Sequence, residues 1–307
     1  MMTSPFLLLM ACQHSAAEPK PPIQTQSVQD DQTSAKQWIR DRWNSARADH
    51  QWAPPSPIEQ TAIANIVFKL VQEAQNCDTP MASEASLKLK EYGFTVDAFS
   101  NGSDQFWFIY EAQNGRGHGA LAIRCGEATE VVLQAPHAIF DQWTGAIVRD
   151  LFAANPFRMA MWNTTHRYRA HPQSTKTDEH HPADVAHNSD SVFHQVSLEL
   201  LNLPTLRIAQ IHGFSQQNDW EIILSFGNAD AQAEQLATQL TPLSSSIGLY
   251  GTTASVLGAT TNVLAKSIPS TEHGRFVHIE LNKTLRTELK SNSAKQKILS
   301  KALKQQW

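Results

Sequence analysis

From residue 131 onward, short apolar runs alternate with longer stretches that have helical spacing. Five runs predict strands: VVLQA, FRMAMWN, TLRIAQIHG, WEIILSFG and RFVHIELN. The stretches between and after them predict helices: TGAIVRDLFAA, SDSVFHQVSLELLN, DAQAEQLATQL and a basic amphipathic helix at the C-terminus. Alternation of this kind is typical of an α/β fold. We therefore expect residues 131–307 to form an α/β core, a mixed and mostly parallel sheet flanked by helices.

The residues before this core predict an N-terminal α+β extension over 37–130 that leads into it. Residues 37–49 have helical spacing, and Ser56-Pro57-Ile58-Glu59 is a capping box with proline at the first helical position. MASEASLKLKEYGF predicts a further helix. Three strands follow, FTVDAF, QFWFIYEA and GALAIRCG, separated by turns that contain glycine and asparagine.

The first residues predict export. PFLLLMA is too short to span a bilayer. It leads into Leu9-Met10-Ala11-Cys12, which resembles the lipobox of bacterial lipoproteins, although no Lys or Arg precedes it. The resemblance implies a signal peptide over residues 1–11, lipidation of Cys12 and a lipid anchor in the cell envelope or periplasm. The alternative is an ordinary apolar N-terminus. Residues 12–36 are polar and contain proline, which predicts a flexible tether.

The overall composition is that of a globular protein. Of 307 residues, 41% are hydrophobic and 18% are charged, and the net charge of −4 gives no indication of nucleic-acid binding. Besides Cys12, the chain has Cys77 and Cys125, which could pair in an oxidising compartment or remain free thiols. The absence of a CxxC motif excludes a zinc ribbon or thioredoxin-like site.

Polar residues with metal-binding or acid–base chemistry stand where three predicted strands end. His137 follows VVLQAP, His212 and Gly213 follow RIAQI, and Glu280 lies near the end of HIELN. His278 is two positions before Glu280 and therefore shares its face of the sheet. Because sites in open α/β sheets gather at the carboxyl ends of strands, we expect these side chains to meet there.

The residue types at these strand ends suit a catalytic zinc ion. Such an ion takes three protein ligands and leaves one position open for water. His137, Asp141 and His212 form a set of two histidines and one carboxylate. Zinc lowers the pKa of bound water towards about 7. Glu280 could then act as the general base and return the proton to a leaving amine.

Six motifs in order give the sequence a family resemblance. They are PHAIFDQWTG, NTTHRYR, AHNSDSVFHQ, QIHGF, GATTNV and HIELNKTLR, and they span roughly residues 131–290. This order resembles the N-formylglutamate amidohydrolase and poly-gamma-glutamate hydrolase group, zinc enzymes related in fold to zinc carboxypeptidases and aspartoacylase. The resemblance implies a zinc carboxypeptidase-like core. It also implies zinc ligation by His137, Asp141 and His212 and a catalytic role for Glu280.

The same resemblance implies where a substrate binds. Asn163 and Arg167 are the nearest match to the segment that engages the substrate carboxylate, and Arg286 falls in the LR that closes the last motif. We therefore expect a small acidic or peptide-like substrate. Asp141 stands four positions after His137, whereas carboxypeptidases place a glutamate at three, so the substrate class stays open.

Residues 166–194 contain six histidines, whose role the sequence leaves open. They are His166, His171, His180, His181, His187 and His194. They could capture metal or form a second site, or they could be scattered side chains of a polar loop. His187 and Asp190 could join the site, although Asp190 could simply cap the following helix. Thr260, Thr261 and Asn262 could border the cleft or serve a turn.

Two functions are compatible with these features. The first is an exported zinc-dependent hydrolase that cleaves an amide bond of an N-acyl amino acid or peptide. The second is a periplasmic lipoprotein that binds metal or ligand without turnover. Glu280 discriminates between them, because a binding protein needs the metal ligands but no carboxylate beside the open metal position.

Overall fold

The computed structural model describes residues 34–48, 51–77, 79–102, 104–111, 115–215, 219–226 and 230–307. The expected signal peptide, Cys12 and most of the expected tether lie outside the described residues. Within the described ranges, no helix has the length and apolar character needed to cross a bilayer.

The described residues form one nine-stranded sheet with the order β1-β2-β3-β5-β4-β6-β9-β7-β8. The strands are β1 (Phe94–Asn101), β2 (Asp104–Glu111), β3 (Ala120–Arg124), β4 (Thr129–Ala135), β5 (Phe157–Trp162), β6 (Arg207–Phe214), β7 (Ile222–Ser225), β8 (Ile247–Leu249) and β9 (Phe276–Asn282). Strands β5, β4, β6 and β9 are parallel, while β1–β3 and β7 introduce antiparallel pairs. This mixed sheet confirms the predicted α/β class.

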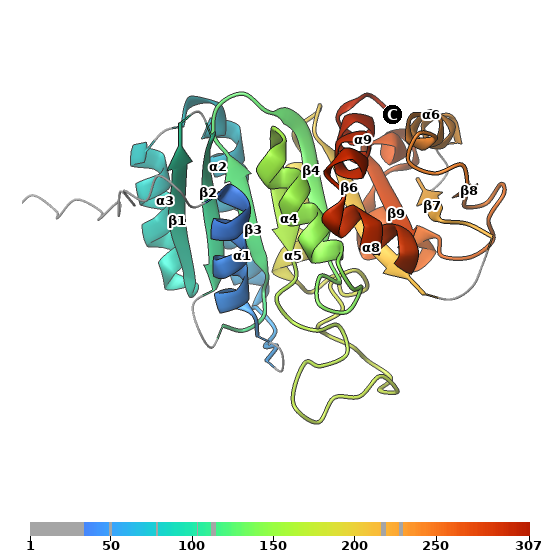
Figure 1. The fold of residues 1–307 in the computed structure, drawn as a ribbon. Coiled ribbons are helices and arrows are strands. Elements are labelled where there is room, and N and C mark those ends of the chain that lie inside the picture. The colour runs from blue at the N-terminus through green and yellow to red at the C-terminus, as the bar shows by residue number, and fades with distance from the viewer. Residues whose placement is uncertain are drawn as a thin grey trace, which may run out of the picture.

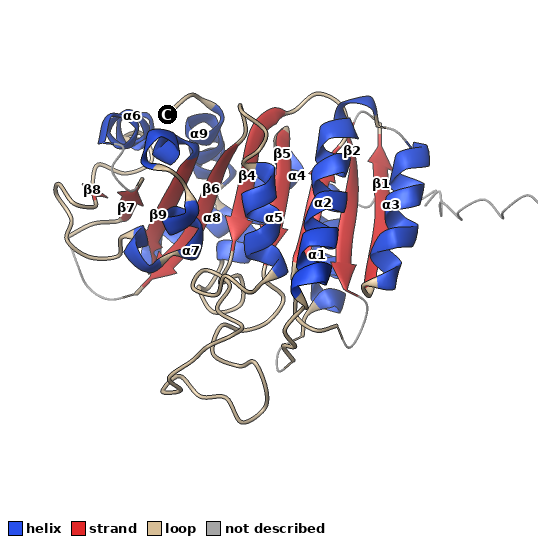
Figure 2. Ribbon diagram, turned by 180° about the vertical axis from the view of Figure 1, so that it is seen from behind, coloured by secondary structure: helices blue, strands red, loops and turns tan. Residues whose placement is uncertain are grey.

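Helices cover both faces of the sheet. They are α1 (Ala35–Ala46), α2 (Pro57–Glu73), α3 (Thr79–Glu91), α4 (Thr144–Ala154), α5 (Val192–Leu200), α6 (Asp230–Leu240), α7 (Val263–Ser267), α8 (Lys283–Ser291) and α9 (Ser293–Lys304). Figure 1 looks onto the face covered by α1, α4, α8 and α9, and Figure 2 looks onto the face covered by α2, α3, α5 and α7. Apolar side chains from each helical layer pack against the sheet in two large cores, which hold the strand ends in place.

The predicted N-terminal extension adds strands to the same sheet. Strand β3 pairs antiparallel with β5, so β1–β3 continue the sheet of the core. The capping box at the start of α2 is confirmed, because Ser56 Oγ accepts from the Glu59 amide and the Glu59 carboxylate accepts from the Ser56 amide. Cys77 and Cys125 are both free thiols.

The C-terminal helix differs from the prediction. It is divided into α8 and α9 at Asn292, whose side chain accepts from the amides of Ala294 and Lys295 at 3.0 and 3.1 Å. Asparagine competes well for such amides and therefore favours a new helix start over continuation. The short strand β8 was also not expected from its sequence, SSIGLYG.

The parallel strands bring the predicted site residues to one edge. Strands β4, β6 and β9 run in the same direction, and the long loop after β5 extends beyond their carboxyl ends (Figure 2). The register of β6 and β9 sets Gln210 beside His278 and His212 beside Glu280. Four side chains thus lie on one face of two neighbouring strands, close to this edge.

Candidate metal centre

His137, Asp141 and His212 converge at the carboxyl ends of β4 and β6. His137 and Asp141 share one tight turn, in which the Asp141 amide donates to the His137 carbonyl at 2.8 Å. His137 Nδ1 lies 3.2 Å from Asp141 Oδ2 and 3.2 Å from His212 Nδ1, and His212 Nδ1 lies 3.6 Å from Asp141 Oδ2. Ligand atoms of a tetrahedral zinc ion stand about 3.3 Å apart, given zinc–ligand bonds of about 2.0–2.1 Å. The three atoms therefore have the spacing of a zinc ligand set.

The two histidines of this set differ in charge. Burial opposes protonation of His137, but the carboxylates of Asp184 and Asp141 outweigh it and raise its pKa to about 9. For His212, burial and the neighbouring His278 ring hold the pKa well below its usual range. Asp141 is also buried, yet the charge of His137 keeps the pKa of its carboxyl well below normal. Asp141 is thus ionised, as a metal-binding carboxylate must be.

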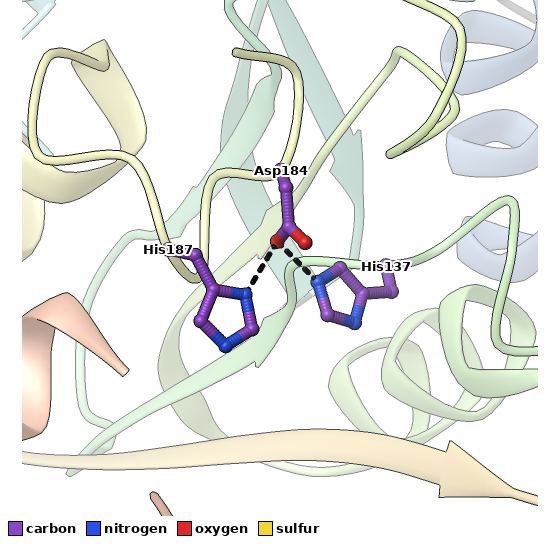
Figure 3. Close-up of side chains that lie close together, drawn as sticks. All are labelled: His137, Asp184 and His187. Carbon is purple, nitrogen blue, oxygen red and sulfur yellow. Dashed lines mark hydrogen bonds and ion pairs between the residues drawn. The ribbon is translucent and has the colours of Figure 1, made fainter. Parts of the chain in front are cut away.

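A second carboxylate, Asp184, binds the other ring nitrogen of His137. Asp184 Oδ1 lies 2.8 Å from His137 Nε2 and 3.0 Å from His187 Nδ1, so both rings point at the same oxygen (Figure 3). A carboxylate at this position fixes the ring and directs its other nitrogen to a metal. Asp184 is not among the site residues predicted from the sequence. Its only signal is an Asp-x-x-His spacing shortly before α5.

Arg167 reaches the same centre from the long loop after β5. Its guanidinium forms an ion pair with Asp184, and its Nη1 lies 3.2 Å from His137 Nδ1. It also lies over the rings of Tyr168 and Phe140, at 4.8 and 5.6 Å from their centroids. The structure therefore brings this predicted substrate-binding residue to the site.

Glu280 and His278 lie on β9 beside His212. Glu280 Oε1 is 3.2 Å from His278 Nε2, which confirms that the two share one face of the sheet. The His278 ring stacks on His212 with centroids 4.2 Å apart. Glu280 Oε2 is buried and has no hydrogen-bond partner. Burial of an unpaired carboxylate oxygen is costly, and a catalytic role or a bound water or ion is among the reasons for which proteins retain one.

The other two predicted substrate residues direct their polar atoms at the backbone. Asn163 Nδ2 donates to the Ala183 carbonyl at 2.9 Å, next to Asp184. The Arg286 guanidinium donates to the carbonyls of Gln142 and Phe214 at 3.0 and 2.9 Å. Both side chains thus hold segments that carry site residues, and their contact with substrate stays a prediction.

The histidine-rich segment forms a long loop that leads into α5. Among the described residues, three clusters have metal-binding geometry, and His187 is the one histidine of this segment that joins such a cluster. His187 Nε2 also bonds Thr261 Oγ1 at 3.0 Å. The capping role considered for Asp190 is wrong: Ser191 caps α5, accepting from the His194 amide at 3.1 Å. Asp190 lies one position too early for that geometry.

Comparisons with known proteins reveal similarity to solved hydrolase structures at low identity. No protein-family model and no curated protein matches the sequence. An N-formylglutamate amidohydrolase from Ralstonia eutropha is 11% identical with a TM-score of 0.38, covering 61% of this chain and 96% of that one. A succinylglutamate desuccinylase from Chromobacterium violaceum is 13% identical with a TM-score of 0.38, covering 76% and 72%. A metallo-carboxypeptidase from Burkholderia cenocepacia is 8% identical with a TM-score of 0.33, covering 68% and 63%. These structures include the group that the sequence motifs resemble.

Proposed function

We propose that this protein is a zinc-dependent hydrolase that cleaves an amide bond of an N-acyl amino acid or a peptide. One observation carries the proposal. Three buried ligand atoms, on His137, Asp141 and His212, have the spacing of a zinc site, and the carboxylate of Glu280, which has one unpaired oxygen, lies within 4.8 Å of a ring nitrogen of His212. A site that only binds a metal has no need of that carboxylate.

The residue types present at this centre fit a catalytic zinc ion. Two imidazoles and one carboxylate are the ligand types of catalytic zinc sites, and His137, Asp141 and His212 would hold the ion. Bound zinc would polarise the scissile carbonyl and lower the pKa of the attacking water. Asp184 binds the outer nitrogen of His137, as expected for a metal-ligating histidine.

The side chains around the ligands have separate tasks in amide hydrolysis. Glu280 takes a proton from the attacking water on its unpaired Oε2 and returns it to the leaving amine. His278 holds the other carboxylate oxygen. Arg167 supplies a positive charge at the centre, which suits an acidic substrate or the oxyanion that develops during attack.

A Glu280→Gln variant tests this proposal. It keeps the size of the side chain and removes its basicity, so zinc content and folding should survive while amide hydrolysis falls roughly 10²–10⁴-fold. The assay is a panel of N-acyl amino acids and short acidic or muropeptide-like peptides, with zinc measured by elemental analysis. Glu111→Gln is the matched control, because Glu111 is also a buried strand glutamate but lies on β2 away from the site. It should retain wild-type turnover.

The result also separates the two functions compatible with the sequence. If the wild type is inactive across the panel, and both it and Glu280→Gln bind zinc, the protein binds a metal without turnover. If His212→Ala retains stoichiometric zinc, His212 is not a ligand and the proposed centre is wrong.

We also propose that the protein is exported and anchored through a lipid on Cys12. Leu9-Met10-Ala11-Cys12 and the polar residues after it support this. Cys12→Ser should abolish palmitate labelling and membrane association. Wild-type protein that is unlabelled and recovered in the cytoplasm would contradict the proposal.

A further inference from the structure

A chain of buried polar side chains runs from His212 into the interior of the molecule. It passes through Gln210 on β6 and Gln134 on β4 to Ser197 on α5, and Asn262 joins it from the start of α7. All four side chains are 0–2% exposed. A buried polar group destabilises the fold unless it is hydrogen-bonded. The donor and acceptor in each of these hydrogen bonds therefore show how each side chain is oriented.

Backbone groups fix both ends of this chain. Asn262 Oδ1 accepts from the amides of Leu264 and Ala265 at 3.0 and 3.2 Å, as the N-cap of α7. Its Nδ2 must therefore point the other way, and it donates to Gln210 Oε1 at 2.6 Å. At the far end, Ser197 donates to the Phe193 carbonyl and accepts from Gln134 Nε2, each at 2.7 Å.

The fixed ends determine the orientation of the Gln210 amide. Its Oε1 accepts from Asn262, and its Nε2 donates to Gln134 Oε1 at 2.9 Å. A flipped amide would set two donors against each other at Asn262 and two acceptors against each other at Gln134. Gln210 therefore presents an oxygen to His212.

The His212 ring must therefore donate a hydrogen bond to that oxygen. His212 Nε2 lies 2.8 Å from Gln210 Oε1, so Nε2 carries the hydrogen. In the neutral ring the other nitrogen, Nδ1, then bears a lone pair. Nδ1 is the atom that faces His137 and Asp141. The amide chain thus selects the tautomer that a metal ion needs.

We propose that Gln210, whose amide is oriented by Asn262, is a positioning residue that fixes the metal-binding tautomer of His212. The inference rests on the metal role proposed for His212. Loss of such an outer partner typically weakens metal binding 10–100-fold.

Three variants test Gln210 in the full-length protein, with zinc affinity measured by competition against a chromophoric chelator. Gln210→Leu removes the acceptor and should weaken zinc binding 10–100-fold. Gln210→Glu keeps an acceptor for His212 Nε2 and should bind zinc more tightly than Gln210→Leu, while its buried carboxylate, set against Gln134 Oε1, should lower the melting temperature of the metal-free protein. Gln134→Leu is the control, because it breaks the same buried chain one step further from His212 while Asn262 still orients the Gln210 amide. It should lower the melting temperature of the metal-free protein as Gln210→Leu does, yet bind zinc within about threefold of wild type.

Two outcomes would overturn the inference. One is wild-type zinc affinity in Gln210→Leu, and the other is an equal loss of affinity in Gln134→Leu, which would make the effect one of general stability.

A spectroscopic measurement separates this inference from the proposed function. Long-range ¹H–¹⁵N NMR of the metal-free protein, with His212→Gln assigning the signal, reports which nitrogen of His212 carries the proton. We expect the Nε2–H form in the wild type and a mixture of forms in Gln210→Leu. The Nδ1–H form in the wild type would overturn the inference even if zinc binds. A wild type that binds no zinc but has the Nε2–H form would overturn the proposed function alone.

Discussion

The two histidines of the candidate metal centre present the same atom, Nδ1, but their surroundings are opposites. His137 stands in a loop, and its outer nitrogen bonds Asp184, which also pairs with Arg167 and His187. His212 stands on a central strand, and its outer nitrogen bonds the neutral amide of Gln210. The carboxylates raise the pKa of His137 to about 9, whereas burial and His278 keep that of His212 well below normal. Charged groups thus hold His137, on what we call the charged side of the centre, and neutral hydrogen bonds hold His212, on the neutral side.

This difference follows from where each histidine lies. The His137 side is built on loops near the surface, where water reaches part-exposed side chains such as that of His187. The His212 side is built inside the sheet, where a charge would carry a large desolvation cost and neutral amides carry less. The proposed metal centre is therefore supported by ion pairs where it is built on loops, around His137, and by neutral amides where it is built inside the sheet, around His212.

The largest expected effect concerns the charged side. Asp184→Ala leaves the His137 and Arg167 side chains without their shared carboxylate, and removing one partner of a buried ion pair costs about 3–5 kcal/mol. Gln210→Leu should cost about 1–3 kcal/mol, because it leaves neutral groups unpaired. Urea unfolding of the metal-free variants measures both. Asp190→Ala, an exposed aspartate of the same loop, is the control and should stay within about 0.5 kcal/mol of wild type. Equal losses for Asp184→Ala and Gln210→Leu would remove the distinction between the two sides.

A second prediction concerns the number of protons that the protein releases when zinc binds. With a pKa of about 9, His137 is protonated at pH 7 in the metal-free protein, while His212 is neutral. Zinc must displace the Nδ1 proton of His137, so we expect binding at pH 7 to release about one proton. Calorimetry in buffers of different ionisation enthalpy measures this number. Release of close to zero protons would show that His137 is already neutral. The Arg167 guanidinium, at 3.2 Å from His137 Nδ1, would then lower the pKa of His137 more than the two carboxylates raise it.

The raised pKa of His137 also makes the stability of the metal-free protein depend on pH. The pKa of His137 is about 9 in the folded protein and about 6.5 when unfolded, so its protonation favours the folded state. That contribution, on the order of 3 kcal/mol, is complete below pH 6.5 and is lost as the pH rises through about 9. The metal-free protein should therefore become less stable across this window, and Asp184→Asn should reduce the slope.

The residues proposed as ligands could be brought together from the sequence, whereas the residues that support them could not, for a physical reason. His137, His212 and Glu280 follow apolar runs, and the rule that strand ends share an edge brings them together without further information. Asp184 could not be found in this way, because it stands in an irregular loop whose path depends on contacts such as that between Asn163 and Ala183.

The sequence does contain a signal for Gln210. It lies two positions before His212 on a strand and therefore on the same face. A glutamine in the apolar run RIAQI needs a buried partner, and the run VVLQA contains a second glutamine at Gln134. The direction of their hydrogen bonds still required the structure, because it is set by the cap of α7. The division of the C-terminal helix at Asn292 is similar, since Asn292 could be accommodated on an exposed helix face.

The smallest expected effect lies at the outer limit of the charged side. Thr261 is exposed, and its hydroxyl bonds His187 Nε2 at 3.0 Å, three groups away from the nitrogen that would face the metal. Thr261→Val removes this bond and keeps the shape of the side chain. His187 keeps its contact with Asp184, and water can replace the hydroxyl at an exposed site, so we expect a change below about 0.5 kcal/mol in stability. Zinc affinity, measured by the same chelator competition, should stay within about twofold of wild type, because outer-partner effects of 10–100-fold come from groups that touch a ligand directly. A loss of tenfold or more would show that the charged network of His137 extends to the GATTNV turn. The two sides of the centre would then meet in that turn, since Asn262, the next residue, orients Gln210.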